Sequence, residues 1–119
     1  MRIALLALCA VTGCASFSSL KSETSIEPNK SFLLGGGQPG AFEVTGRNSG
    51  TVPVTLFVER NGKRDSIAIV PAGSAFDATF PAGAMAVVRN ESSTLTAVVT
   101  VTVRGDIANL GMRYEPARR

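Results

Sequence analysis

The chain has 119 residues, with 12 lysines and arginines, 9 aspartates and glutamates, and no histidine or tryptophan. The formal charge of +3 is too mild to predict nucleic-acid binding, which calls for a clustered basic patch. The absence of histidine excludes Ser-His-Asp and Cys-His catalysis.

The first fourteen residues carry a targeting pattern. Arg2 precedes an uncharged, mostly apolar run at residues 3–11, and Gly13 supplies the small residue found at signal-peptide cleavage sites. Cys14 follows that glycine directly, and this order resembles the lipobox of bacterial lipoproteins. The resemblance implies diacylglycerol on the Cys14 sulfur, cleavage before Cys14 and often a third acyl chain on the new amino terminus. The alternative is an ordinary secretory signal with a chance cysteine.

Such a lipid anchors a protein to a membrane without spanning it. The apolar run is much shorter than the roughly 20 residues needed to cross a bilayer, whereas two or three acyl chains hold a protein stably. Ala15, not aspartate, follows the cysteine, and in the Gram-negative lipoproteins that this segment resembles this favours the outer membrane. We therefore expect a lipid-anchored cell-envelope protein, with the side of the membrane left open.

Few groups remain for metal binding or catalysis once residues 1–13 are removed. The other cysteine, Cys9, lies in that segment, so the mature body has neither histidine nor a thiol and cannot form a His/Cys metal site. Carboxylates are scattered singly, as on solvated strand faces and turns: Glu43, Glu59, Asp65, Asp77, Glu91 and Asp106. We predict no catalytic residue, no cofactor and no metal, and an enzyme only if folding brings two acids together in a cleft.

Composition divides the chain into three parts. Residues 1–13 are interpreted as the lipoprotein signal peptide. Residues 14–30 are interpreted as the lipidated cysteine and a flexible, serine-rich tether. Residues 31–119 are expected to form one domain.

That domain has the pattern of an all-β protein. Turn signals recur about every 8 to 12 residues, with short β-branched runs of period-2 alternation between them. The clearest run is residues 95–103, in which one face is expected to hold Leu95, Ala97, Val99, Val101 and Val103. This pattern predicts a single antiparallel β-sandwich of about seven to eight strands and almost no helix. The cadence of residues 40–80 also resembles the broad class of immunoglobulin-like export domains, without matching a named family. Strands are expected near residues 31–34, 41–47, 51–60, 63–70, 74–80, 84–90, 94–104 and 107–114.

One hairpin can be predicted in register. Asn61-Gly62 is the preferred pair for a two-residue type I′ turn, in which both central residues have positive φ. The turn predicts four cross-strand pairs: Arg60–Lys63, Glu59–Arg64, Leu56–Ile67 and Val54–Ile69.

If successive strands run in opposite directions, the turns sort to two ends. Turns at 47–51, 71–74 and 90–94 should share one end with the tether and the C-terminus, which would place Arg118 and Arg119 beside the lipid. Turns at 35–40, 61–62, 81–83 and 104–106 should share the other end. Four basic residues would cluster at that distal end as candidate contacts to an acidic partner: Arg60, Lys63, Arg64 and Arg104.

Two classes of function remain. The first is a non-enzymatic interaction or structural module of the envelope, contacting the membrane through the lipid and an envelope protein through its folded body. The second is a binding protein for a small apolar ligand or lipid, which requires an internal apolar pocket of roughly 300 Å³ or more.

Overall fold

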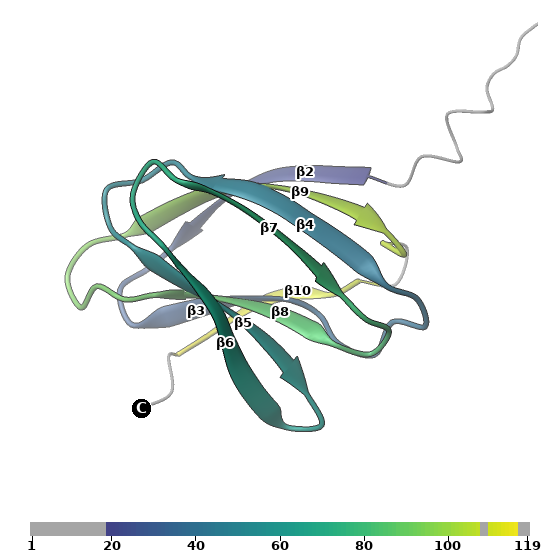
Figure 1. Cartoon of the computed structure of the whole chain (residues 1–119). Coiled ribbons are helices and arrows are strands. Elements are labelled where there is room, and N and C mark those ends of the chain that lie inside the picture. Colours follow the sequence, from purple (N-terminus) through teal and green to yellow (C-terminus); the bar gives the residue numbers. More distant parts are fainter. Residues whose placement is uncertain (1–18, 108–109, 117–119) are drawn as a thin grey trace, which may run out of the picture.

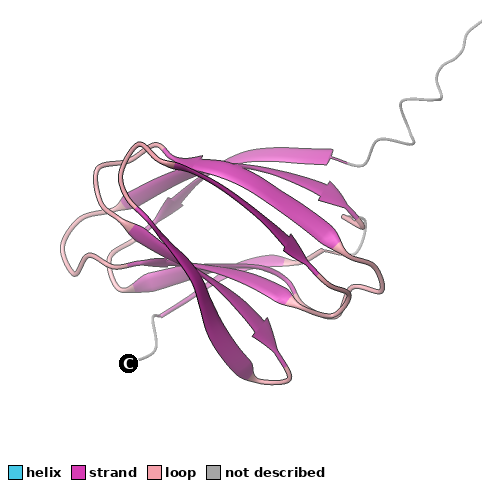
Figure 2. Cartoon of the chain, in the orientation of Figure 1, coloured by secondary structure: helices cyan, strands magenta, loops and turns pink. Residues whose placement is uncertain are grey.

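The computed structural model describes residues 19–107 and 110–116, and all regular elements among them are strands (Figure 1, Figure 2). The strands of this part of the chain are β2 (Ser19–Ile26), β3 (Lys30–Gly35), β4 (Phe42–Asn48), β5 (Val54–Arg60), β6 (Lys63–Val70), β7 (Ala75–Phe80), β8 (Met85–Asn90), β9 (Ala97–Gly105) and β10 (Met112–Pro116). They form two antiparallel sheets, with the orders β10-β3-β8-β5-β6 and β2-β9-β4-β7. The expected all-β antiparallel sandwich is confirmed. The predicted signal peptide and Cys14 lie outside the described residues.

The strand order is that of a jelly roll with one strand added. From β2 to β9 the chain alternates between the two sheets at every connection except β5–β6, which gives the double Greek-key order of a jelly roll. β10 extends the larger sheet beside β3. An immunoglobulin sandwich keeps more consecutive strands within one sheet. Regular turn spacing therefore predicts a sandwich but does not specify the order of its strands.

The core lies between the sheets and is made of the inward-facing residues of both. Seventeen hydrophobic side chains form one buried cluster there. The alternation predicted for β9 is confirmed, since its four inward residues at 97, 99, 101 and 103 are at most 1% exposed. Leu95, predicted on the same face, precedes the strand and is 54% exposed. Phe42 and Phe80 stack within this core, with ring centroids 5.1 Å apart.

The tether predicted over residues 14–30 is wrong for residues 19–26, which form β2. This strand pairs with β9 along its whole length, from Ser19 to Ile26. Thr24 and Ile26 are buried against the core, whereas the charged residues between them and Ser19 are exposed. The strand was not predicted because serine and threonine occupy two of its four inward positions, so the alternation carries little hydrophobic contrast.

The β5–β6 turn has the predicted conformation. Asn61 has φ of 53° and Gly62 has φ of 77°, as a type I′ turn requires. Beside the turn, Arg60 pairs with Lys63 and Glu59 with Arg64, as expected.

Farther from the turn the register shifts by one residue through a β-bulge. Leu56 pairs with Ala68 and not Ile67, and Val54 pairs with Val70 and not Ile69, so these two predicted pairs are wrong. The two isoleucines are 45% and 71% exposed. The bulge places the smaller neighbours on the core face, and it increases the local twist of the hairpin.

The two ends of the sandwich carry different loops. We call one the hairpin end: it holds the β5–β6 turn, the β3–β4 and β7–β8 loops, and residues 105–107 and 110–111. The opposite end holds residues 27–29, 49–53, 71–74 and 91–96. The predicted sorting of the turns is therefore confirmed.

The predicted position of the tether is wrong, because the additional strand reverses the direction of entry. The chain enters β2 at the hairpin end, where Ser19 pairs with Arg104, and leaves β10 at the opposite end, where Pro116 pairs with Lys30 (Figure 1). The first described residue, Ser19, and the last residue of β10, Pro116, therefore lie at different ends of the sandwich. Arg118 and Arg119 lie outside the described residues.

Replacing Gly62 with valine should lower the free energy of unfolding by more than about 1 kcal/mol, because a β-branched residue resists positive φ. No atom lies within 4 Å of a Cβ built at this glycine, so a loss would report backbone strain and not a clash. Gly111→Val is the matched control, since Gly111 is equally open and lacks a left-handed φ. Urea denaturation measures both variants, and an unchanged midpoint for Gly62→Val would contradict the turn assignment.

Candidate functional site

The four basic residues predicted as partner contacts all lie toward the hairpin end. Arg60 ends β5, Lys63 and Arg64 begin β6, and Arg104 lies near the end of β9. Arg60, Lys63 and Arg104 are exposed. Arg64 is different: its side chain is only 12% exposed and is held by two carboxylates. The structure therefore brings three of these residues to an accessible surface and assigns the fourth to an internal contact.

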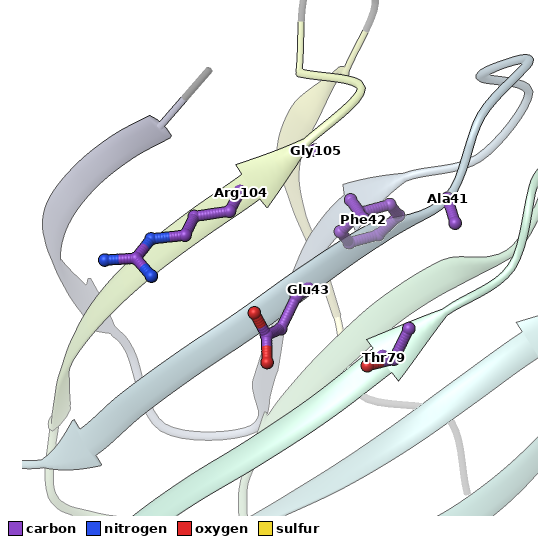
Figure 3. Close-up of a pocket in the computed structure, with 6 residues that line it drawn as sticks. All are labelled: Ala41, Phe42, Glu43, Thr79, Arg104 and Gly105. Atoms are coloured by element: carbon purple, nitrogen blue, oxygen red, sulfur yellow. The ribbon is translucent and has the colours of Figure 1, made fainter. Parts of the chain in front are cut away.

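Two depressions border the exposed basic residues. One has a volume of about 420 Å³ and is lined by residues of the hairpin: Val58, Arg60, Asn61, Lys63 and Asp65. The other, about 390 Å³, lies where β9, β4 and β7 run side by side, and Figure 3 shows Arg104, Glu43 and Thr79 on these three strands. The first combines two basic groups with one carboxylate and the second combines one of each, so these surfaces suit polar, charged contacts.

Arg64 joins the two edges of the five-stranded sheet. Its Nε donates to Glu59 Oε1 at 2.7 Å, and its Nη2 donates to Glu115 Oε1 at 2.9 Å. Glu59 is on the neighbouring strand β5, but Glu115 is on β10, at the other edge. In a flat sheet those edges would be about 19 Å apart, four spacings of about 4.8 Å. The ion pair therefore requires a strongly curled sheet, as the twist added by the β6 bulge favours.

The curled sheet encloses a second apolar cluster on the face that points away from the core. This outer cluster consists of Leu33, Phe57, Met85 and Val87, all at most 8% exposed. Three arginines cover it. Arg64 crosses above it to Glu115, the Arg89 guanidinium carbon lies 4.6 Å from the centroid of the Phe57 ring, and Arg113 Nη2 contacts Met85 Sδ at 3.8 Å.

The two carboxylates keep Arg64 charged. Burial by itself lowers the pKa of the Arg64 guanidinium, but the hydrogen bonds to Glu115 and Glu59 and the charges of both outweigh burial and raise that pKa above its ordinary value. Stability from this network is therefore present at neutral pH and would be lost, for the arginine, only in strong alkali. Long side chains with apolar stems and charged heads replace a second protein layer over the outer cluster.

Folding brings two acids, Glu59 and Glu115, together around one group. The guanidinium of Arg64 occupies the space between them, where a substrate or a water molecule would have to bind for acid–base catalysis. Among the described residues, no group of three or more His, Cys, Asp or Glu side chains is placed to hold a metal ion. The geometry of the acids is that of a structural ion-pair network.

Side chains fix the loops of the hairpin end to one another. Gln38, in the glycine-rich β3–β4 loop, is 2% exposed and donates to the carbonyls of Ala84 at 2.9 Å and Pro81 at 3.3 Å. Asp106 accepts a hydrogen bond from the Gly40 amide at 2.8 Å. These contacts connect three loops, so this end presents a defined surface.

Buried asparagines do the same at the opposite end. Asn90 is 2% exposed, donates to the carbonyls of Ile26 and Leu95 at 2.9 and 2.8 Å, and accepts from the Ser92 amide at 2.8 Å. Asn48 makes the equivalent three contacts at the end of β4. Each asparagine therefore satisfies backbone groups that leave the sheets, and both act as structural residues.

Comparison of the chain with protein-family models, curated proteins and solved structures found no match. Within residues 19–107 and 110–116, no helix is long and apolar enough to cross a membrane. The case for a function therefore rests on the residues and geometry of this chain.

Sequence analysis missed the outer cluster, although a signal for it exists. Residues 32–34, 56–58 and 85–88 are uninterrupted apolar runs within strands otherwise expected to alternate. Such runs are typical of strands that are buried on both faces. The partnership of Arg64 with Glu115 has no comparable signal, because it depends on the curl of the whole sheet.

Replacing Arg64 with methionine should lower the free energy of unfolding by about 1–3 kcal/mol, because Glu59 and Glu115 would lose their shared cation beside apolar side chains. Methionine keeps the aliphatic stem, so the loss reports the charge. Arg60→Met, at the exposed neighbouring position, should stay within about 0.5 kcal/mol of the original protein. Equal urea midpoints for the two variants would show that the network contributes nothing.

Proposed function

We propose that the protein is a lipid-anchored, non-enzymatic interaction or structural module of the bacterial envelope, attached through an acylated Cys14. The observation that carries the proposal is the position of the lipobox-like segment directly before a rigid domain. β2 begins at Ser19, only five residues after Cys14. An anchor so close to the fold holds the sandwich at the membrane surface, and Ala15 favours the outer membrane.

The arrangement of the acids supports a role without catalysis. The sequence offers neither histidine nor, after processing, a free thiol. Glu59 and Glu115 are engaged by Arg64, and Glu91 accepts hydrogen bonds from Thr55 and Arg89. These carboxylates stabilise the outer face of the sheet, which is a structural task.

The interior of the sandwich favours this proposal over the binding of a small apolar ligand. The buried cluster between the sheets consists of seventeen hydrophobic side chains, most of which come from strands of the two sheets. An apolar-ligand site would need roughly 300 Å³ among these residues. The depressions beside the basic residues are instead bordered by charged side chains at the surface.

The anchor can be tested with the two cysteines of the sequence. Cys14→Ser should abolish acylation and leave an uncleaved or soluble product, because the acyl acceptor is lost. Cys9→Ser is the matched control and should be processed and acylated normally, since Cys9 lies within the predicted signal peptide. Mass spectrometry of the mature protein and membrane fractionation measure both. If Cys14→Ser is cleaved and retained in the membrane like the original protein, the lipoprotein proposal is wrong.

A further inference from the structure

The short connection to the proposed anchor restricts how the sandwich can stand on a membrane. Five residue steps separate Cys14 from Ser19, which is a reach of at most about 18 Å. Ser19 lies at the hairpin end, where it pairs with Arg104. From there β2 runs to Ile26 at the opposite end, seven residue steps or about 24 Å away.

These two lengths decide the orientation. If the loops of the opposite end rested on the membrane, Ser19 would stand about 24 Å or more above the surface. The connection cannot reach that height. The entry of the chain at the hairpin end must therefore stay within about 18 Å of the lipid headgroups, and the sandwich cannot stand upright on its opposite end.

The side chains at the hairpin end suit a headgroup surface. Arg60 and Lys63 flank the β5–β6 turn, and Arg104 lies on the neighbouring sheet, one strand from the entry of the chain. All three are exposed. Lys21, on β2 beside the entry point, is exposed as well. Basic side chains near a membrane are attracted to anionic headgroups.

We propose that the hairpin end is a membrane-docking surface, on which Arg60, Lys63 and Arg104 contact anionic phospholipid headgroups. The inference rests on the acylation of Cys14 proposed above. It replaces the distal, protein-facing role predicted for these residues from the sequence. Loops 27–29, 49–53, 71–74 and 91–96 then form the surface that faces away from the membrane.

Two similar turns give a matched pair of probe positions. Pro81-Ala82-Gly83 lies at the hairpin end and Pro71-Ala72-Gly73 at the opposite end, and both alanines are exposed. The acylated protein would carry Ala82→Cys or Ala72→Cys, each labelled with a fluorophore, in vesicles that bear a quencher on the headgroups. Quenching should be several-fold stronger at position 82 than at position 72. Equal or reversed quenching would overturn the orientation.

Lengthening the connection between Cys14 and Ser19 separates the effect of the basic side chains on orientation from the effect of the short connection. A flexible Gly/Ser segment inserted after Ala15 should remove the orientation in phosphatidylcholine vesicles but preserve it in vesicles that contain phosphatidylglycerol. In the lengthened protein, combined replacement of Arg60, Lys63 and Arg104 by glutamine should remove the orientation in the vesicles that contain phosphatidylglycerol as well. Arg47→Gln at the opposite end is the control and should change neither result.

The outcomes separate this inference from the proposal on which it rests. An absent acyl mass at Cys14 would refute the anchor itself. A normal acyl mass with no preference for phosphatidylglycerol after lengthening would refute the headgroup contact alone. If the probe at position 82 is not quenched in vesicles but is crosslinked to an acidic envelope protein in cells, the hairpin end binds a protein, and membrane docking is overturned.

Discussion

The pairing of β2 with β9 is the constraint on which the rest of the structure depends. The register from Ser19–Arg104 to Ile26–Ala97 completes the smaller sheet and buries Ile26 in the core. It also sets the direction in which the chain enters the fold. Without β2, the first strand would be β3 and the chain would enter at the opposite end. One edge strand of mostly polar residues thus controls both the closure of the sandwich and the end at which the chain enters it.

A second constraint acts on the larger sheet. The bulge in β6 sends the two isoleucines outward and adds twist to the β5–β6 hairpin. The curl that accompanies this twist lets Arg64 reach Glu115 across the sheet, over the outer cluster. An apolar surface that would otherwise invite association is covered in this way by charged side chains with long stems. The same contact removes Arg64 from the basic surface of the hairpin end, so charge at that surface comes from its neighbours.

Local signals predicted the elements of this fold better than their arrangement. Asn61-Gly62 predicted the turn because its conformation depends on these two residues alone. The alternation in β9 predicted which face is buried because the side chains of that face are themselves apolar. Ile67 and Ile69 misled because hydrophobicity favoured them over Ala68 and Val70 as core residues. The bulge, which has no signal in the sequence, leaves both isoleucines exposed. β2 was missed because its partner, β9, is distant in sequence and supplies most of the hydrophobic surface of the pair. The parity of the strands placed Arg60, Lys63 and Arg104 at one end of the sandwich, as the structure has them. Their position relative to the proposed anchor depended on the missed strand.

The structure also gives the two ends of the sandwich different physical characters. At the hairpin end, Gln38 and Asp106 hold the loops together while basic side chains extend outward. At the opposite end, Asn48 and Asn90 hold backbone groups internally, and Glu27 and Lys30 form an ion pair at 3.0 Å. A surface of loops held by hydrogen bonds favours recognition by shape and hydrogen bonding, whereas a basic surface favours a polyanion or a membrane. If the short connection holds the basic end at the headgroups, the surface left for a protein partner is the one whose loops are fixed by buried asparagines. The rigidity of those loops then has a functional reason, since a preformed surface loses less conformational entropy on binding.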